Sequence, residues 1–284
     1  MLKMNAKRWT ILLILVLASV SGWRFGYGHV WPQVLFAVVC AVGADVIFDL
    51  FVLKKPVFSE STVITGLIVA VLPAPESPLL PIALMSLFAI ASKRLIRVDR
   101  RNVFNPAALG LLIGVLLFGA RLSWWVDANH LLTILAGAVL FTVFSGRWRS
   151  IFAFLAVFII LIIARAVALG HPIPADLYLY VSISSFFVFF MLTDPRTSPL
   201  MPKDQPLFAA VVAVGSFLSV IFHPASIFLG GLLLADVLTI FLNRRSFANL
   251  VKMSKPAPPP APLPSAPVPT ASLPSGPAPT SGTA

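Results

Sequence analysis

The 284-residue chain is 58% hydrophobic and only 11% charged, a balance that excludes an ordinary water-soluble domain. Its mean hydropathy of +0.96 indicates an integral membrane protein. The basic surplus, 21 Lys and Arg against 10 Asp and Glu, is typical of membrane proteins that keep positive charge in their cytoplasmic loops, so we expect a lipid bilayer and no nucleic acid as partner. The single cysteine, Cys40, excludes an intrachain disulfide and a thiolate-held metal centre, and no metal site is expected.

The first apolar run, Thr10 to Val20, has some likeness to a secretory signal because basic residues precede it. These basic residues are Lys3, Lys7 and Arg8. Since the rest of the chain is itself apolar enough to be embedded in a membrane, we expect this run to be retained as a first helix and not cleaved as a leader.

Apolar runs separated by charged breaks predict an all-α membrane protein with about ten transmembrane helices. The predicted spans are 9–22, 30–51, 62–72, 79–92, 105–119, 130–144, 150–169, 176–192, 206–222 and 226–242. Several are shorter than the roughly 20 residues that cross a hydrocarbon core. Short helices are tolerated where their ends are buried in protein or line a cavity, so these spans indicate an internal site.

The distribution of Lys and Arg tests this count of spans. With the N-terminus in the cytoplasm, the outer loops contain only Arg24 and Arg121, and Arg165 lies near the outer end of the seventh span. A miscounted helix would invert every later loop, so the separation predicts ten spans with both termini cytoplasmic. The tryptophans are expected at helix ends in the headgroup layer, with Trp124 and Trp125 at an outer end.

Two pairs of similar segments predict that the spans form two pseudo-symmetric halves. Residues 105–118, which open with Asn-Pro, resemble residues 223–236, which open with His-Pro, and residues 59–66 resemble residues 193–199. In transporters, short segments in corresponding positions mark the binding site. The Asn-Pro motif is predicted inside and the His-Pro motif outside, so the halves are not simple copies.

The chain is expected to divide into a polytopic membrane domain, residues 1–250, and a cytoplasmic tail, residues 251–284. From Pro256 onward the sequence is almost entirely Pro, Ala, Ser, Thr and Gly. Such a segment cannot bury enough apolar surface to fold, so we predict a disordered tail. An inert extension is favoured over a tether for a proline-recognising partner.

Two asparagines stand immediately before an apolar run, in the segment RRNVFNPAALG of residues 100–110. Three residues apart at the start of a helix, Asn102 and Asn105 share one face with the free backbone amides. This concentration of donors suits a planar ligand with many acceptors or an anionic group. The alternative is capping, with Asn105 as N-cap and Pro106 at the first helical position, which explains Asn105 equally well but Asn102 less well.

Two further polar segments offer a similar choice between ligand contact and helix structure. In FSESTVITG, Glu60 can compensate a positive helix end, while Thr65 and Gly66 either contact a ligand or allow close helix packing. In MLTDPRTSP, Thr193 and Asp194 precede a proline at another inner helix end, where an ordinary helix stop is the alternative.

Carboxylates inside the predicted spans need a partner or a proton. Asp45 and Asp49 lie near the inner end of the second span, and Asp236 lies deep in the tenth. A carboxylate at membrane depth is by default a functional candidate, and Asp236 is the strongest one here.

Three of these segments, STVITG, NVFNPAALG and MLTDPRTSP, resemble in order and separation the NqrB/RnfD family, which comprises a membrane subunit of sodium-translocating NADH:quinone oxidoreductase and its counterpart in the Rnf electron transport complex. The similarity covers roughly residues 30–245. It implies a ten-helix fold of two pseudo-symmetric halves, flavins in the membrane arm, and electron flow coupled to Na⁺ or H⁺ translocation. It also implies the bacterial inner membrane and, as partners, other subunits of a membrane redox complex.

The resemblance assigns roles to individual residues. Asn102 and Asn105 match a segment associated with non-covalent riboflavin. The other implied cofactor-binding positions are Thr65 and Gly66 of the Thr-Gly helix start and Thr193 and Asp194 of the Thr-Asp-Pro turn. Glu60 matches an acidic position near the inner ion path, and we expect that path to be lined by Glu60, Asp194 and Asp236.

One departure from the family pattern concerns covalent flavin. Family members carry FMN on a threonine of a Ser-Gly-Ala-Thr-like segment in the outer loop after the Asn-Pro helix. Here that loop, GARLSWWVDANH of residues 119–130, contains no threonine. We therefore expect no covalent FMN, and riboflavin or FMN bound non-covalently as the cofactor.

These observations leave three hypotheses for function. The first is a membrane-embedded electron-transport subunit that binds non-covalent flavin; with no GxGxxG motif and no cysteines for an iron–sulfur cluster, it would be at most a subunit of an oxidoreductase. The second is a small-solute or ion transporter or channel of the same fold without redox chemistry. The third is a scaffold that only assembles partners. We favour the first, because the motifs that are kept are those associated with non-covalent flavin.

Overall fold

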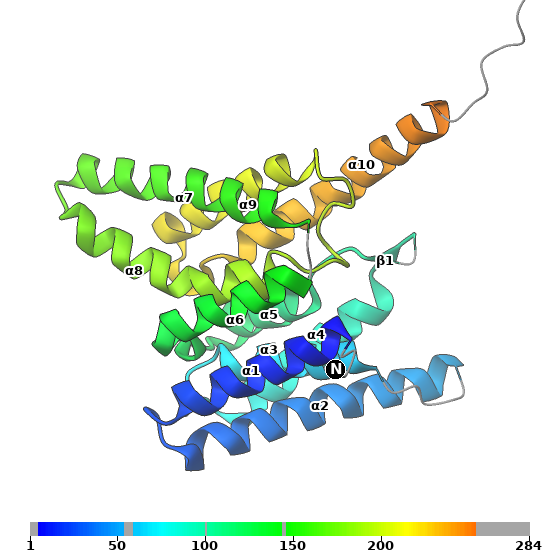
Figure 1. Ribbon diagram of the computed structural model, residues 1–284. Helices are drawn as coiled ribbons and strands as arrows, with labels where there is room; N and C mark the ends of the chain where they lie inside the picture. Colours follow the sequence, from blue (N-terminus) through cyan, green and yellow to red (C-terminus); the bar gives the residue numbers. More distant parts are fainter. Residues whose placement is uncertain (1–4, 54–58, 100, 144–145, 254–284) are drawn as a thin grey trace, which may run out of the picture.

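The computed structural model describes residues 5–53, 59–99, 101–143 and 146–253, and these are almost entirely helical (Figure 1). The first group of helices is α1 (Ala6–Gly22), α2 (Tyr27–Leu53), α3 (Glu60–Val71), α4 (Leu79–Leu95) and α5 (Pro106–Phe118). The second is α6 (His130–Val143), α7 (Trp148–Leu169), α8 (Ile173–Phe186), α9 (Gln205–Phe222) and α10 (Leu229–Met253). Short elements join them: β1 (Arg97–Val98), β2 (Arg101–Asn102), the 3-10 turns η1 (Trp125–Asn129) and η3 (Pro224–Ser226), and the π segment η2 (Phe187–Met191).

Each predicted span coincides with a helix, so the predicted all-α character is confirmed. Within the described ranges, three stretches are long and apolar enough to cross a membrane, namely Tyr27–Phe51, Trp148–Leu169 and Gln205–Phe222. The helices α3 and α5 are apolar but shorter, as expected from the sequence. The molecule is a multi-pass membrane protein, and the exact number of crossings stays a prediction.

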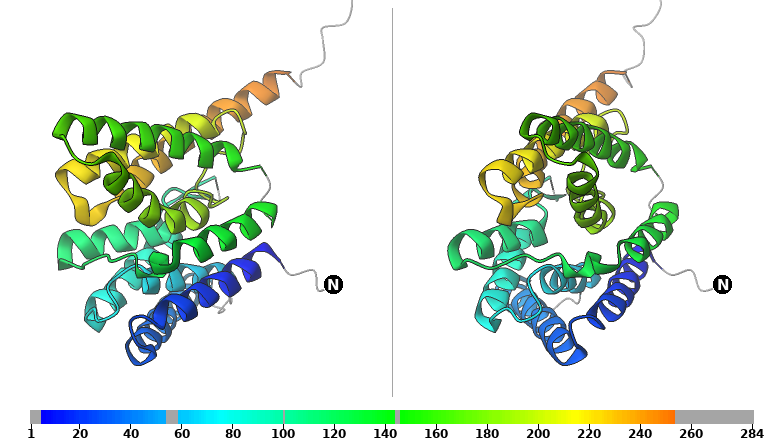
Figure 2. Two further views of the ribbon diagram at one scale, coloured as in Figure 1. Left: turned by 60° about the vertical axis from the view of Figure 1, so that its left-hand side comes forward. Right: turned by 90° about the vertical axis from the view of Figure 1, so that its left-hand side faces the viewer.

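The helices form two groups that lie one above the other in Figure 1. In the first, α2 packs on α3 and α4, and α4 packs on α5; in the second, α7 packs on α8 and α9, and α9 packs on α10. In the end-on view of Figure 2, α8 lies between the two groups; its C-terminal end, with Phe186, is buried, whereas Tyr178 nearer its start is 65% exposed. The order of contacts in one group therefore repeats in the other.

Large apolar side chains cover the outside of the bundle. Phe51 is 84% exposed, Phe222 78% and Leu80 69%, while the buried core contains phenylalanines such as Phe154 and Phe187. Apolar surface of this extent is not stable in water, and in a bilayer it faces lipid. The exposed side chains therefore agree with the helices in identifying a membrane protein.

Glycines allow two helix pairs to approach closely. A Cβ on Gly110 of α5 would lie 2.3 Å from the carbonyl oxygen of Met85 in α4. A Cβ on Gly215 of α9 would lie 2.5 Å from the Cα of Gly231 in α10. Small residues at such contacts are the usual basis of helix packing in membranes.

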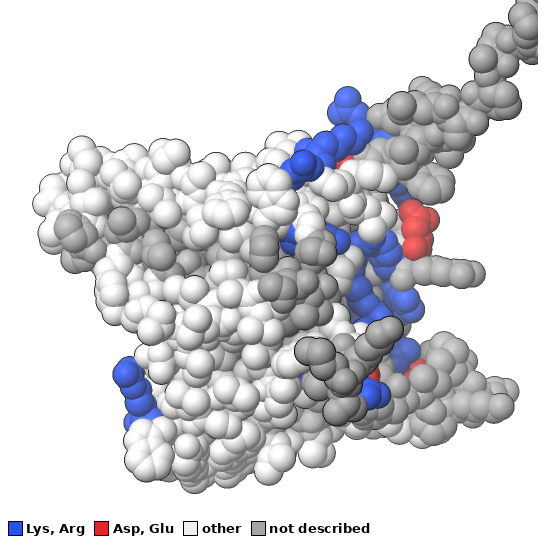
Figure 3. All heavy atoms as spheres, in the orientation of Figure 1, with Lys and Arg blue, Asp and Glu red and all other residues white. Residues whose placement is uncertain are grey.

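Basic side chains gather at one end of the molecule (Figure 3). This basic end carries the start of α1, the turn of residues 192–204 and the hairpin in which β1 and β2 pair antiparallel, Arg97 opposite Asn102. The opposite end carries the connection between α1 and α2 and the loop of residues 119–129. The separation of charge predicted from the sequence is present, whereas its orientation in the membrane stays a prediction.

Three expectations from the sequence need correction or comment. Trp124 and Trp125 lie at the end opposite the basic end, as expected, but their side chains are only 4% and 2% exposed and pack inside the bundle instead of facing lipid. Residues 59–66 begin a helix whereas residues 193–199 follow one, so these two segments do not occupy equivalent positions. The helix α10 continues to Met253, into the segment predicted as tail; the rest of that segment, residues 254–284, lies outside the described residues.

Candidate functional site

The start of α5 is built as a capped helix end. The side-chain oxygen of Asn105 accepts the backbone N–H of Ala108 at 3.1 Å, and Pro106 occupies the first helical position. The backbone N–H of Asn105 itself donates to Oδ2 of Asp236 in α10 at 2.7 Å. The capping interpretation of Asn105 is therefore confirmed, and the same residue ties α5 to a buried carboxylate.

Asn102 is not part of this helix. It lies in β2, three residues before the cap, and is 7% exposed. The expectation that Asn102 and Asn105 share a helix face is therefore wrong, because the hairpin of residues 97–102 replaces the first turn that the spacing suggested. The two side chains nevertheless line the same cavity.

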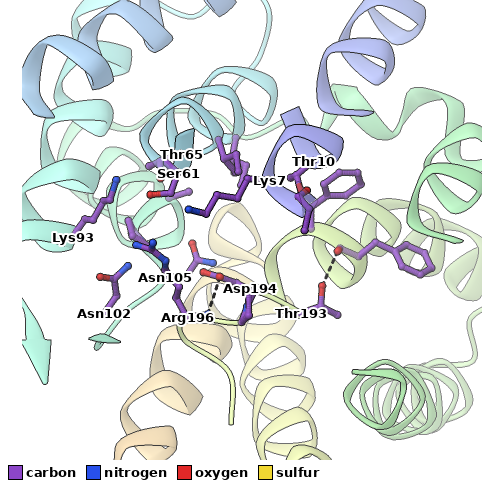
Figure 4. Close-up of a pocket in the computed structure, with 18 of the residues that line it drawn as sticks. Lys7, Thr10, Ser61, Thr65, Lys93, Asn102, Asn105, Thr193, Asp194 and Arg196 are labelled. Carbon is purple, nitrogen blue, oxygen red and sulfur yellow. Dashed lines mark hydrogen bonds between the residues drawn. The ribbon is translucent and has the colours of Figure 1, made fainter. Parts of the chain in front are cut away.

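This cavity, which we call the flavin-candidate cavity, has a volume of about 300 Å³ and lies at the basic end between α1, α3, α5 and the turn after η2 (Figure 4). Five of the six residues predicted to bind a cofactor line it: Thr65, Asn102, Asn105, Thr193 and Asp194. The sequence did not identify several other lining residues, including Lys7, Ser61, Lys93, Phe189, Phe190 and Arg196.

Two neighbouring aromatic residues form part of the cavity wall. Phe189 and Phe190 belong to η2, and the ring of Phe190 stacks on Phe186 with centroids 4.6 Å apart and an interplanar angle of 9°. Thr193 follows on the same segment and donates its hydroxyl to the carbonyl oxygen of Phe189 at 2.7 Å. The wall thus places aromatic rings beside polar groups, a combination suited to a planar ligand with a polar edge.

Gly66 is the predicted cofactor-binding residue that does not line the cavity. It faces α2, where an added Cβ would lie 3.0 Å from both the Cα of Val38 and the Cβ of Ala41. Its role in the fold is close helix packing, the alternative considered from the sequence. Thr65, one residue earlier, donates its hydroxyl to the carbonyl oxygen of Ser61 and borders the cavity.

Arginines hold the turn that carries Asp194. Arg101 donates to the carbonyl oxygen of Pro195 at 2.8 Å, and Arg147 to that of Pro199 at 2.8 Å. Oδ1 of Asp194 accepts the backbone N–H of Arg196 at 3.0 Å, as Figure 4 shows. Burial lowers the pKa of the Arg147 guanidinium below its usual value; the charge of Arg101 acts in the same direction and that of Asp194 in the opposite one.

A second cavity of about 530 Å³ adjoins the first, between the hairpin, the 196–200 turn and α10. Asn102 and Arg196 line both cavities, so they form the wall between them. Asp236 lines the second cavity and is completely buried. Among the described residues its Oδ1 has no hydrogen-bond partner, while Oδ2 accepts from Asn105.

The predicted ion-path residues do not form one continuous row. Asp194 lines the first cavity and Asp236 the second. Glu60, at the start of α3, lines neither and instead accepts Nε of Arg8 from α1 at 2.8 Å. Two of the three carboxylates are therefore in adjoining cavities, and the third lies in an ion pair at the rim of the bundle.

A buried charge network lies behind the first cavity. Arg94 contacts Oδ1 of Asp45 at 2.6 Å and Oδ1 of Asp49 at 2.8 Å, which explains how α2 accommodates two carboxylates. Lys93 donates to Oγ1 of Thr62 at 2.5 Å, and the Thr62 hydroxyl donates to Asp45. Residues four apart share a helix face, so Asp45 and Asp49 of α2 can both reach Arg94 on α4, a partner that could not be read from the sequence.

At the opposite end, the loop predicted to lack covalent flavin folds into the bundle. Trp124 packs edge-on against Phe228, with ring centroids 5.4 Å apart. Both carboxylate oxygens of Asp127 accept the backbone N–H of Phe186, at 3.1 and 2.9 Å. Burial raises the pKa of Asp127 to about 7, against the opposing effect of hydrogen bonds from Phe186 and Thr133.

Known proteins that are similar to this chain belong to the family that the motifs indicate. The family described as NQR2, RnfD, RnfE matches residues 3–131. The RnfD protein of the ion-translocating oxidoreductase complex from Escherichia fergusonii is 28% identical over 152 residues, which cover 49% of this chain and 43% of that protein. The RnfD protein from Escherichia coli K12/DH10B is 30% identical over 152 residues, with the same coverage.

The chain thus matches less than half the length of these curated relatives. The motifs STVITG and NVFNPAALG lie inside residues 3–131, the part that the family matches. The predicted resemblance to the NQR2, RnfD, RnfE family is confirmed, and the family match covers residues 3–131; the third motif, MLTDPRTSP, lies beyond that range.

Proposed function

We propose that the chain is an electron-transport subunit of a bacterial inner-membrane complex and that the flavin-candidate cavity binds riboflavin or FMN non-covalently. The observation that carries this proposal is that residues from separate sequence motifs meet at one cavity. Thr65, Asn102 and Thr193 come from three separate segments, were identified through the family resemblance of their motifs, and border one cavity. Similarity to the RnfD proteins of ion-translocating oxidoreductase complexes supports the same conclusion.

The chemistry of the lining fits a flavin. The ring system of a flavin is planar, with an apolar edge and an edge rich in carbonyl and nitrogen acceptors; Phe189 and Phe190 suit the former, and Asn102 and Lys93 the latter. The volume of about 300 Å³ lies at the lower end of the range of about 300–1,000 Å³ found for small-molecule sites. When bound, the flavin would supply acceptance and release of electrons, while these side chains bind and orient it.

The first experiment is a spectrum of the detergent-purified protein before and after acid precipitation. We expect flavin absorbance and fluorescence that pass into the supernatant, because no covalent attachment is expected. Asn102→Leu is the variant of choice, because its side chain lines the cavity without capping α5. Thr239→Val is the matched control, since Thr239 lines only the second cavity.

Loss of flavin in Asn102→Leu with retention in Thr239→Val supports the proposed site. A colourless wild-type protein that stays colourless after reconstitution with riboflavin and with FMN would overturn it. That result would favour the second candidate function, a small-solute or ion transporter or channel on the same fold.

We further infer that ions cross near the two adjoining cavities. Asp236 supports this, because it is fully buried and its Oδ1 has no hydrogen-bond partner in the part of the chain that the structure describes, so a cation or a proton would be stabilised there. Asp194 borders the neighbouring cavity. Stability of the purified protein should rise with Na⁺ relative to choline, and Asp236→Asn should abolish the rise. If Na⁺ stabilised the wild type and Asp236→Asn equally, Asp236 would not be part of the ion path.

The fold is proposed to consist of two inverted halves, α1–α5 and α6–α10. Support comes from the repeated order of packing, in which α2, α3, α4 and α5 are matched by α7, α8, α9 and α10. Five crossings in each half would invert the second half, which accounts for Asn-Pro and His-Pro motifs at opposite ends. Both termini would then face the cytoplasm; accessibility of engineered cysteines at Asn5 and Asn129 to an impermeant reagent in intact cells tests this orientation.

A further inference from the structure

We infer that Lys93 sets the charge preference of the flavin-candidate cavity, so that the ligand is bound more tightly in its reduced, anionic form than in its oxidised, neutral form. This inference rests on the proposed function, because it concerns the ligand of the same cavity. It assigns a role to a residue that neither the motifs nor the family resemblance identified.

The first observation is the position of Lys93. It lies in the last turn of α4, is only 6% exposed, and lines the cavity together with Asn102 and Asn105. An ammonium group that is nearly withdrawn from solvent interacts strongly with charge that develops beside it, because little water screens the interaction. Lys93 is therefore better placed than a surface lysine to respond to the charge of a ligand.

The second observation is that Lys93 is held in place. Its Nζ donates to Oγ1 of Thr62 at 2.5 Å and lies 4.0 Å from Oδ2 of Asp45. Both oxygens of Asp45 have closer partners, Arg94 at Oδ1 and the Thr62 hydroxyl at Oδ2. The carboxylate therefore anchors Lys93 at a distance without forming a direct, short ion pair that would satisfy the ammonium group.

The third observation is the balance of charge around the cavity. Among its lining residues, Lys7, Lys93 and Arg196 are basic and Asp194 is acidic. Figure 4 shows the Lys7 and Lys93 side chains on the side of the cavity formed by Ser61 and Asn105, whereas Asp194 lies beside Arg196. A cavity with this lining stabilises negative charge on its occupant.

Reduction of a flavin creates such a charge. Uptake of two electrons and one proton converts the neutral oxidised ring system into a reduced form with a charge of −1; the electrons come from the reductant and the proton from solvent. Lys93 stabilises this form relative to the oxidised one and thereby raises the midpoint potential. The residue changes no bond and acts through its charge alone.

The test is a potentiometric titration of the purified protein, followed by flavin absorbance. Lys93→Met retains the length of the side chain and removes the charge. We expect the preference for the reduced form to fall about tenfold, which for a two-electron couple lowers the midpoint by about 30 mV. Lys93→Arg should restore the wild-type value. Lys7→Met is the matched control and should shift the midpoint less, because Lys7 is more exposed than Lys93 and no residue anchors it in the same way among the described residues.

The possible results separate the two proposals. A wild-type protein that binds no flavin overturns the proposed function and this inference together. A Lys93→Met protein that binds flavin with an unchanged midpoint overturns only the role of Lys93. If Lys93→Met does not fold, the double variant Lys93→Met/Asp45→Asn keeps the buried charges balanced, and its midpoint is compared with that of Asp45→Asn alone: a lower midpoint in the double variant supports the role of Lys93, and an equal one overturns it.

Discussion

At the basic end of the bundle, a cavity of about 300 Å³ separates α3, α5 and the turn of residues 193–196. At the opposite end, residues 124–127 are buried instead, and η1 packs between α1, α6 and α8. Both regions contain asparagine or aspartate close to a helix start, and both lie in segments that the family resemblance connects with flavin. At the basic end the polar groups border the cavity. At the opposite end, tryptophan side chains fill the interior of the bundle.

The comparison teaches that two loops at opposite ends of one bundle can differ in packing, one bordering a cavity and the other built into the core. Trp124 and Trp125 are large, and Asp127 accepts an N–H from inside α8, so this loop is part of the core. The retained motifs, in contrast, border open volume that their own side chains do not fill. Variants at the two ends should therefore behave differently. At the end with residues 124–127, which we call the filled end, they should change stability. At the basic end with the flavin-candidate cavity, which we call the hollow end, they should change ligand binding.

The largest effect is expected from Trp125→Ala at the filled end. Trp125 is 2% exposed, and its truncation leaves a cavity, so we expect a loss of about 3–5 kcal/mol in the free energy of unfolding. Trp125→Phe is the control: it keeps most of the ring and removes an indole N–H that has no partner among the described residues. Reversible unfolding in mixed micelles measures both variants. Equal losses in the two would contradict a packing role.

A smaller effect is expected from Asp127→Ala, which leaves the N–H of Phe186 buried without its acceptor. The cost should be about 1–3 kcal/mol, measured by the same unfolding assay. Asp127→Asn keeps an acceptor oxygen and should lose less. A loss in Asp127→Asn as large as in Asp127→Ala would show that the charge, and not the hydrogen bond, matters.

Asp127 also predicts a pH dependence of stability. Its pKa is raised from 3.8 to about 7 by burial, so between these values the folded state binds a proton that the unfolded state does not. The contribution of Asp127 to stability therefore falls as pH rises from about 4 to 7, and the full penalty applies above that window. Relative to Asp127→Asn, the wild type should be less stable at pH 8 than at pH 5; a constant difference between them would contradict the raised pKa.

At the hollow end, Asn105→Ala should cost about 1 kcal/mol, because it removes the cap of α5 without creating a large cavity. Asn105→Ser retains a capping oxygen and should recover most of the stability. If flavin is retained by Asn105→Ser and lost by Asn105→Ala, the cap positions the site. If both lose flavin, the amide group itself contacts the ligand.

The smallest effect is expected at the rim, in the ion pair of Arg8 and Glu60. The side chain of Arg8 is 67% exposed and that of Glu60 23%, so solvent and salt screen their attraction. A double-mutant cycle with Arg8→Gln and Glu60→Gln should give a coupling energy of about 0.2–1 kcal/mol that decreases with added salt. A larger, salt-independent coupling would indicate that Glu60 belongs to a buried path.

Much of the fold could be predicted from the sequence. Ten apolar runs correspond to helices, most with nearly the predicted bounds, although α10 continues to Met253; a segment in lipid must satisfy its own backbone groups and leaves a simple apolar signature. The start of α5 at Asn105-Pro106 could also be predicted, because helix capping depends on residues that are neighbours in the sequence. The family motifs selected five residues that border one cavity.

Contacts between distant segments were decided only by the tertiary structure. No local pattern distinguishes Gly66, which packs against α2, from Thr65, which borders the cavity. The burial of Trp124 and Trp125 was not predicted, because an aromatic residue near a helix end suits both the headgroup layer and a buried loop. Sequence patterns determine which segments cross the membrane, since that depends on local hydrophobicity; the partners of Lys93 and Asp236 depend on helix packing, which brings together residues far apart in the chain.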